Sequence, residues 1–280
     1  MIAGLGLIVG GAGAGLFGSL LGLGGGVLIV PMLTLGFGMP LRDAVGVSLV
    51  SVIVTSSASA SVYLQRHVAN LRLGMTLELF TAFGALVGGL LAYLLDERTL
   101  AGLFAALLIY VAISMLVRHD PRAGGEGAVA NDAETSDDEE PPSGGRDATA
   151  RLSGPGYRIR HIGPGLAGSI GAGVVSALLG IGGGLVKVPV MNVIMGVPLR
   201  VATATSNLMI GITASASAVI YLVRGGIDPS VAAPIAVGAF VGASLGSRTA
   251  HRIDLRVLRL LFVGVLGYTA FEMTRKALLL

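Results

Sequence analysis

The chain contains a long internal repeat. Residues 15–66 align without a gap to residues 173–224, 158 positions later, and 23 of the 52 aligned pairs are identical. The identical pairs include glycine, proline and hydroxyl residues: Gly22/Gly180, the triple glycines 24–26 and 182–184, Pro31/Pro189, Pro40/Pro198, Ser48/Ser206 and Thr55/Thr213. A repeat interrupted at the same glycine cluster in each half predicts two related structural units in one chain.

The composition places these units in a lipid bilayer. Of the 280 residues, 53% are hydrophobic and 12% are charged, which is too little polar surface for a water-soluble globule. Apolar runs suited to crossing a membrane occur at 44–64, 74–95, 99–117, 202–222, 230–247 and 257–274. Two further apolar stretches, 2–37 and 162–197, contain the glycine clusters. We therefore expect an all-α, multi-pass protein of the cell membrane, and the glycine-broken repeats favour a secondary transporter.

One segment breaks the hydrophobic pattern. Residues 118–161 are rich in Gly, Pro and Ser and carry eight carboxylates between Glu126 and Asp147. This composition is typical of a solvated, disordered segment. We therefore divide the chain into membrane repeat 1 (1–117), a disordered acidic linker (118–161) and membrane repeat 2 (162–280).

Two topologies fit the hydrophobic pattern. If each glycine-broken stretch is a single span, each half has four spans and the repeats are parallel. If the stretch is a re-entrant hairpin, with limbs 2–21 and 24–37 in the first half, each half has a hairpin and three spans, so the second half is inverted. With a cytoplasmic linker, the inverted arrangement puts seven basic residues of the short loops inside and five outside, and the parallel one reverses these numbers. Because basic loops favour the cytoplasm, we prefer inverted repeats.

The glycine clusters are the first candidate site. Glycine costs helix stability, and a helix break at membrane depth is tolerated where it is buried in protein or lines a polar cavity. The free N–H groups after such a break can bind an anion. Gly15 and Gly18 are better explained by close helix packing. The candidate substrate-binding glycines are Gly24, Gly25, Gly26, Gly182, Gly183 and Gly184.

A stripe of hydroxyl residues follows each glycine cluster. Its members are spaced by seven and four residues, which places them on one helix face: Ser48, Thr55 and Ser59 in the first half, and Ser206, Thr213 and Ser217 in the second. Asn207 widens the stripe, and Ser57 and Ser215 lie on its flank. Such residues can bond their own backbone or join neighbouring helices. As neutral donors beside the glycine clusters they would also suit a small oxyanion.

Lys187 breaks the symmetry of the repeats, because its partner in the first half is Ile29. An intramembrane lysine is costly and marks a functional site unless it reaches the interface. We take an anionic substrate as its counter-charge, and snorkelling to the interface as the alternative. Glu78 and Glu272 are candidates for ion coupling, but we expect both to be interfacial, so no coupling ion is assigned.

Signals for enzymes, cofactors and nucleic acid are weak. The segment GIGGGLVK lacks the Gly-Lys-Ser/Thr order of a phosphate-binding loop. Cysteine is absent, and the four histidines form no metal-binding or catalytic pair. The net charge of +3 has no basic-aromatic pattern beside it. We therefore expect no enzyme activity, no cofactor, no metal and no nucleic-acid partner.

The two motifs resemble the sulfite exporter TauE/SafE family. The likeness rests on the repeated pattern GxGGGxxxVPxL, a Pro-Leu-Arg turn and an A-x-[GA]-x-S helix: residues 22–26, Pro31, 44–49 (AVGVSL), His67, Asn70, Leu71, 180–184, Pro189, 202–208 (ATATSNL) and 225–228 (GGID). The resemblance implies an all-helical permease of sulfur-containing oxyanions and allows a homodimer. Lys187 and the long acidic linker are not part of the family pattern.

Three functions remain open from the sequence. The first is a secondary transporter that exports a small sulfur oxyanion, such as sulfite or an organosulfonate, by alternating access between the repeats. The second is an anion channel with the hairpins as a fixed filter. The third is a non-transporting membrane scaffold that acts through the acidic linker. The expected partners are a small anion and the lipid bilayer, and the family resemblance allows a second copy of the chain.

Overall fold

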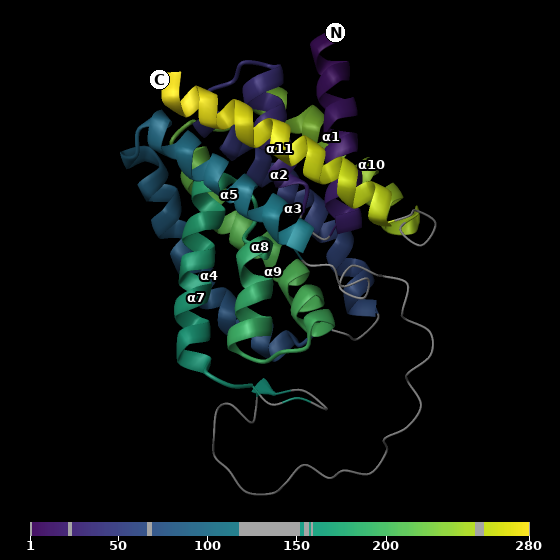
Figure 1. The fold of residues 1–280 in the computed structure, drawn as a ribbon, viewed down its shortest axis with the longest axis vertical. Coiled ribbons are helices and arrows are strands. Elements are labelled where there is room, and N and C mark those ends of the chain that lie inside the picture. Colours follow the sequence, from purple (N-terminus) through teal and green to yellow (C-terminus); the bar gives the residue numbers. More distant parts are fainter. Residues whose placement is uncertain are drawn as a thin grey trace, which may run out of the picture.

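The computed structural model describes residues 2–21, 24–65, 69–117, 152–153, 157, 159–249 and 255–279. Its elements of two or more residues are all helical, which confirms the all-α fold class (Figure 1). In chain order they are α1 (Ile2–Leu21), α2 (Gly26–Pro31), η1 (Met32–Gly36), α3 (Leu41–Gln65), α4 (Leu71–Leu94), α5 (Glu97–Val117), α7 (Ile162–Leu179), α8 (Gly184–Pro189), η2 (Val190–Ile194), α9 (Leu199–Val223), α10 (Pro229–Thr249) and α11 (Leu255–Leu279). Residues 118–151 of the predicted linker lie outside the described part, so their disorder stays a prediction.

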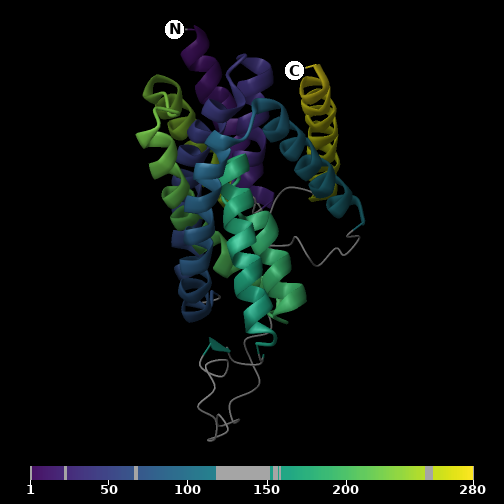
Figure 2. The same cartoon turned by 90° about the vertical axis from the view of Figure 1, so that its left-hand side faces the viewer.

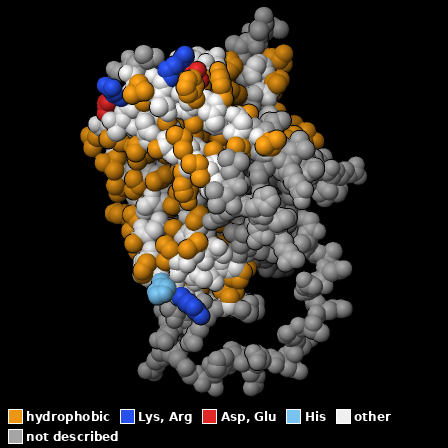
Figure 3. Space-filling model, in the orientation of Figure 1, with side chains coloured by type: hydrophobic (Ala, Val, Ile, Leu, Met, Phe, Trp, Pro, Cys, Tyr) orange, Lys and Arg blue, Asp and Glu red, His pale blue; other side chains and the backbone are white. Residues whose placement is uncertain are grey.

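Six of the described helices are long and apolar enough to cross a membrane. These segments are Leu41–Ala58, Leu71–Leu94, Glu97–Ser114, Ile162–Leu179, Val201–Val223 and Pro229–Gly246. Exposed leucine, valine, isoleucine and phenylalanine side chains cover their outer faces. On the face drawn in Figure 3, the described charged side chains gather at the two ends and apolar side chains lie between them. This distribution fits a chain that spans a bilayer.

Each glycine-broken stretch forms a helical hairpin, as the sequence indicated. After α1, the short helices α2 and η1 run back along it, because methyl groups added at Gly6, Gly10 and Gly18 would contact Phe37, Met32 and Gly25 respectively. α7 and the pair α8 and η2 repeat this arrangement, with Gly165 beside Met195 and Gly168 beside Val190. The return limb has six α-helical and five π-helical residues, and Phe37 just beyond it lies beside Gly6 near the start of α1, so it returns the chain towards the end at which α1 begins.

The bends of the hairpins depend on glycine backbone conformations. Gly24 and Gly25 have φ of 73° and 74°, and Gly182 and Gly183 have φ of 79° and 78°. This left-handed region is disfavoured for residues with a Cβ atom. Pro31 and Pro189 end the α-helical turns that follow, and in each half a π-helical turn comes next. A proline lacks the N–H that would continue the regular ladder, which explains the change in helix type.

Helices pair across the two repeats. α1 packs along α10, α7 packs along α4, α3 packs against α9, and α5 packs against α11 (Figures 1 and 2). Glycines allow the close approach: a methyl group at Gly15 would collide with the backbone of Ala239, and one at Gly88 with the backbone of Val174. The expectation that Gly15 and Gly18 serve packing is therefore confirmed. The first helix of each repeat thus contacts a helix of the other repeat.

Equivalent side chains cap the helices that follow the loops. The Asn70 carboxamide oxygen accepts a hydrogen bond from Leu73 N at 3.0 Å at the start of α4. At the corresponding position before α10, the Asp228 carboxylate accepts from Ser230 Oγ at 2.7 Å and Ser230 N at 2.9 Å. The bond from the Ser230 side chain, with that from its backbone, holds the pKa of Asp228 below its ordinary value. Two residues of the motif noted in the sequence therefore act as N-caps.

Candidate anion site between the two glycine loops

The two hairpin bends meet at the centre of the protein. We call residues 24–26 the first glycine loop and residues 182–184 the second. A methyl group at Gly24 would lie 3.6 Å from the Ile210 side chain and 3.8 Å from that of Val52, and one at Gly182 would lie 2.6 Å and 2.7 Å from the same side chains. Val52 of α3 and Ile210 of α9 occupy equivalent positions in the repeats. The loops therefore converge around an apolar contact between α3 and α9, and the centre is tightly packed in this conformation.

In the first repeat the predicted hydroxyls are bonded to the glycine loops. Ser48 Oγ lies 2.8 Å from the carbonyl oxygen of Gly180 and 3.3 Å from that of Gly26, so it joins the bend of one repeat to that of the other. Thr55 Oγ1 lies 2.9 Å from the carbonyl oxygen of Gly24. Both hydroxyls act as donors to backbone carbonyls. The predicted residue Ser59 lies in α3, but its side chain is outside the described part of the chain.

In the second repeat two serine hydroxyls lack partners. Ser176 Oγ and Ser206 Oγ are buried and have no hydrogen-bond partner among the described residues. They flank the second glycine loop, because a methyl group at Gly183 would lie 3.5 Å from Ser176 Oγ and one at Gly184 would lie 3.5 Å from Ser206 Oγ. A buried unsatisfied hydroxyl is costly. These two groups are thus available to a ligand beside this loop.

A buried network of charges lies close to the second glycine loop. Lys187 Nζ is 2.8 Å from Glu78 Oε2 and also donates to Thr213 Oγ1. The Thr213 hydroxyl donates to Glu78 Oε1 at 2.6 Å. The exposed fractions of Lys187 and Glu78 are 2% and 5%. Each of the three side chains therefore contacts the other two.

This network corrects two expectations. Glu78 was expected at the membrane interface, and this is wrong: it lies inside the helix bundle, because Gly74 and Gly84 of the same helix pack against α9 and α7. The expected counter-charge of Lys187 was an anionic substrate, whereas the structure supplies the carboxylate of Glu78. Lys187 also does not snorkel to the surface.

Two other predicted residues lie in the interior of the helix bundle. Asn207 is buried, and Ser217 Oγ donates to the backbone oxygen of Thr213 at 3.1 Å. Sequence reasoning missed Ser176. Its signal was present in the repeat, because Ser176 replaces Gly18 at the position that packs against the glycine loop.

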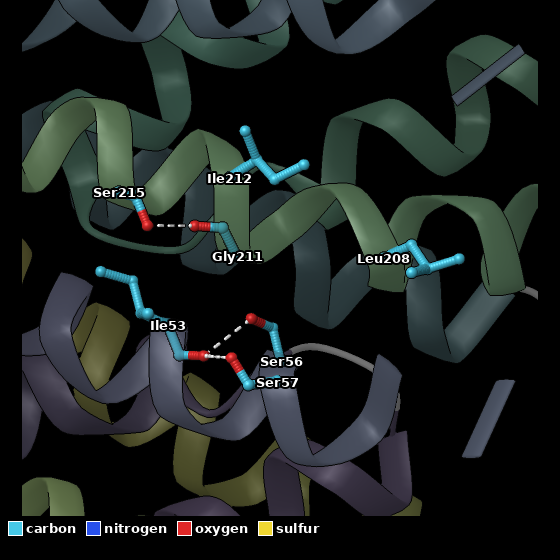
Figure 4. A pocket seen from close by; sticks show the side chains of 7 residues that line it. All are labelled: Ile53, Ser56, Ser57, Leu208, Gly211, Ile212 and Ser215. Carbon is cyan, nitrogen blue, oxygen red and sulfur yellow. Dashed lines mark hydrogen bonds between the residues drawn. The ribbon is translucent and has the colours of Figure 1, made fainter. Parts of the chain in front are cut away.

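A separate pocket of about 230 Å³ lies between α3 and α9 on the flank of the stripe. Ile53, Ser56 and Ser57 line it from α3, and Leu208, Gly211, Ile212 and Ser215 line it from α9 (Figure 4). The hydroxyls of Ser57 and Ser215 donate to the backbone oxygens of Ile53 and Gly211 at 2.7 Å and 2.8 Å. The pocket is therefore mainly apolar, and it lies between equivalent residues of the two repeats, such as Ser57 and Ser215. None of the predicted substrate-binding residues that the structure describes lines it.

The sequence matches one family model, sulfite exporter TauE/SafE, over residues 7–273. The chain belongs to the TauE/SafE sulfite exporter family. It is 25% identical over 260 residues to the probable membrane transporter protein YunE of Bacillus subtilis, with 90% of each chain covered. It is 27% identical over 276 residues to the probable membrane transporter protein MJ0441 of Methanocaldococcus jannaschii, with 93% of this chain and 91% of that protein covered.

A third relative is much longer than this chain. The probable membrane transporter protein MamO of Magnetospirillum gryphiswaldense is 28% identical over 292 residues, which is 97% of this chain but 44% of MamO. No solved structure matches the chain. The TauE/SafE membership and the six apolar helices identify a multi-pass membrane transporter.

Proposed function

We propose that this TauE/SafE protein is a secondary transporter that exports a small sulfur-containing oxyanion, such as sulfite or an organosulfonate. The observation that carries the proposal is the pair of hydroxyls beside the second glycine loop, Ser176 and Ser206, that have no partner among the described residues. Lys187, which is buried on α8, lies one helical turn beyond that loop. Neutral donors near one positive charge bind an oxyanion without holding it too tightly for release.

The two repeats are proposed to be inverted relative to each other. α1 begins at the top of Figures 1 and 2, whereas α7 begins at the opposite end. Each hairpin returns the chain towards its starting side, and we take the three long helices that follow it, α3 to α5 or α9 to α11, as spans, which gives an odd number of crossings in each half. The pairing of α1 with α10 and of α7 with α4 is what a two-fold relation within the membrane would produce.

We propose that this arrangement works by alternating access. The glycine loops close against Val52 and Ile210 in the conformation described, so a substrate can pass only if the loops separate from these side chains. The Ser48 bond from α3 to Gly180 joins the two bends and is a contact that such a movement would break. Exposing the site to one side at a time would give slow, saturable transport.

The decisive experiment uses the purified protein and five sulfur compounds. Sulfite, sulfate, thiosulfate, taurine and sulfoacetate are tested for binding by calorimetry, and those that bind are tested for flux into proteoliposomes. We expect slow, saturable flux that the other bound anions inhibit. Conductance at channel rates would favour a fixed anion filter, and failure of all five to bind would reject the proposed substrate class.

A further inference from the structure

The Lys187–Glu78 pair joins parts of the protein that belong to different repeats. Lys187 lies on α8, the return limb of the second hairpin, and Glu78 lies on α4 of the first repeat. Thr213 of α9 contacts both charged groups. Movement of the second hairpin during transport would therefore change the surroundings of this pair directly.

The fold does not require the pair. The positions in the other half that correspond to Lys187, Glu78 and Thr213 are occupied by Ile29, Ala236 and Thr55. Ile29 is fully buried, and the Thr55 hydroxyl bonds Gly24 instead. The same hairpin thus packs in one half without any charge. Since a buried ion pair contributes little net stability compared with apolar residues, its presence in one half needs another explanation.

No other charged side chain competes at this position within the described residues. α7, which packs along α4, has no acidic or basic residue, and neither α8 nor η2 has one apart from Lys187. The remaining ionisable groups on α4 and α9 lie near the helix ends: Arg72, Tyr93, Arg200 and Tyr221. Of these, Arg72 is exposed and the Arg200 side chain is outside the described part. Glu78 is therefore the counter-charge that faces Lys187.

We propose that Glu78 and Lys187 couple the transport of the anion to the transport of a proton. This inference rests on the proposed function. A proton binds the Glu78 carboxylate and converts it to a neutral carboxylic acid. The incoming oxyanion then takes the place of the carboxylate at the Lys187 ammonium, which keeps its charge throughout. One proton and one oxyanion enter and leave together, so the Lys187 ammonium faces one anionic group in both the empty and the loaded states.

Charge balance makes the two binding events depend on each other. An anion bound without the proton would place two anionic groups at one ammonium, and a proton bound without the anion would leave a buried ammonium unpaired. Both states are costly inside the helix bundle. Thr213 is positioned for the exchange, because its hydroxyl contacts Lys187 and both states of Glu78 can bond to it. Ser176 and Ser206, beside the second glycine loop, would bind the oxygen atoms of the anion that do not contact Lys187.

The test measures proton uptake when an anion binds. Thiosulfate is added to purified wild-type protein in weak buffer containing a pH-indicating dye, with binding followed in parallel by calorimetry. Thiosulfate is chosen because its own charge does not change near neutral pH. We expect wild-type protein to take up about one proton per anion bound. We expect Glu78→Gln to bind thiosulfate several-fold more tightly, with no proton uptake and no dependence of affinity on pH.

Two further variants serve as controls for this test. Glu272→Gln removes a carboxylate that pairs with Arg275 at the surface, and it should leave proton uptake unchanged. The double variant Glu78→Gln/Lys187→Met carries no buried charge and should fold even if Glu78→Gln alone does not. We expect it to lose both proton uptake and pH-dependent binding.

The outcomes separate this inference from the proposed function. If wild-type protein binds thiosulfate or another of the five anions without proton uptake, or if Glu78→Gln still takes up a proton, the coupling is rejected and transport remains. The same dye measurement is made with sulfate and taurine if thiosulfate does not bind. If none of the five binds, the proposed function fails and the coupling fails with it.

Discussion

At the scale of residues, a buried ammonium needs a counter-charge. Lys187 satisfies this need with Glu78, 109 positions earlier in the chain. The hydroxyls of Ser176 and Ser206, beside the second glycine loop, have no hydrogen-bond partner among the described residues. The charge pair and the unpartnered serines therefore differ in how they respond to substitution, and both responses can be measured.

Replacing Lys187 by Met should destabilise the protein strongly. The variant leaves the Glu78 carboxylate buried without a cation, and breaking a buried pair in this way costs about 3–5 kcal/mol. The apparent Tm in detergent measures the loss. Adding Glu78→Leu should restore most of it, because the second charge is then also absent. A single variant at wild-type Tm would show that water reaches Glu78. The pair of exposed Arg275 and half-buried Glu272 is the control, since its loss should cost less than about 1 kcal/mol.

Replacing Ser176 by Ala should weaken anion binding without destabilising the empty protein. Its hydroxyl has no partner to lose, whereas a hydrogen bond to a charged ligand contributes about 1.5–3 kcal/mol, or a loss of affinity of roughly tenfold or more. Calorimetry with the best-bound anion measures this. Ser169→Ala on the same helix is the matched control, because the Ser169 hydroxyl is bonded to Gly165 O at 2.9 Å. Equal affinities for the two variants would remove Ser176 from the site.

At the scale of elements, the crossing of α1 over α10 depends on the absence of side chains. A methyl group at Gly242 would collide with the backbone of Ala12, and one at Gly238 with that of Ile8. The α4–α7 crossing has the same character, since Gly84 faces the backbone of Ile170. Close backbone contact replaces a layer of interlocking side chains at both crossings.

Gly242→Leu should separate α1 from α10 and destabilise the protein. The added side chain meets backbone atoms that cannot rotate away, so the helices must move apart. Thermal unfolding in detergent should show a lower apparent Tm and less folded protein. Gly13→Leu on α1 is the control, because no described atom outside its own helix lies within 4 Å of the added methyl position. A similar Tm for both variants would mean that this crossing is not tightly constrained.

At the scale of the whole molecule, the repeats and hairpins determine which side each loop faces. An odd number of crossings in each half places the end of the first half and the end of the chain on opposite sides of the membrane. An even number places them on the same side. The direction in which α7 runs relative to α1 favours the first arrangement.

Single cysteines should report this topology directly. The natural chain has no cysteine, so Ser136→Cys and Leu280→Cys each introduce a unique thiol. In intact cells, we expect a membrane-impermeant thiol reagent to label one of these variants and not the other, with lysed cells as the labelling control. Labelling of both or neither in intact cells would contradict inverted repeats.

The sequence was sufficient for much of the fold, because helices obey local rules. Apolar runs of membrane-spanning length predicted α3, α4, α5, α9 and α10, and the glycine clusters together with the count of basic loop residues favoured the hairpins. The sequence also placed the hydroxyl stripe on one helix face by its spacing. It did not separate hydroxyls that are bonded, such as Ser48, from the equivalent Ser206, which has no partner among the described residues.

What the sequence determined by itself was the duplicated, glycine-broken, all-helical membrane architecture, since each of these features depends on residues close together in the chain. Only the tertiary structure decided that Lys187 pairs with Glu78 and that the free hydroxyls lie beside the second glycine loop. These features depend on how helices from different repeats cross. Helical periodicity gives the face on which a side chain lies, but not the residue that it meets on the neighbouring helix.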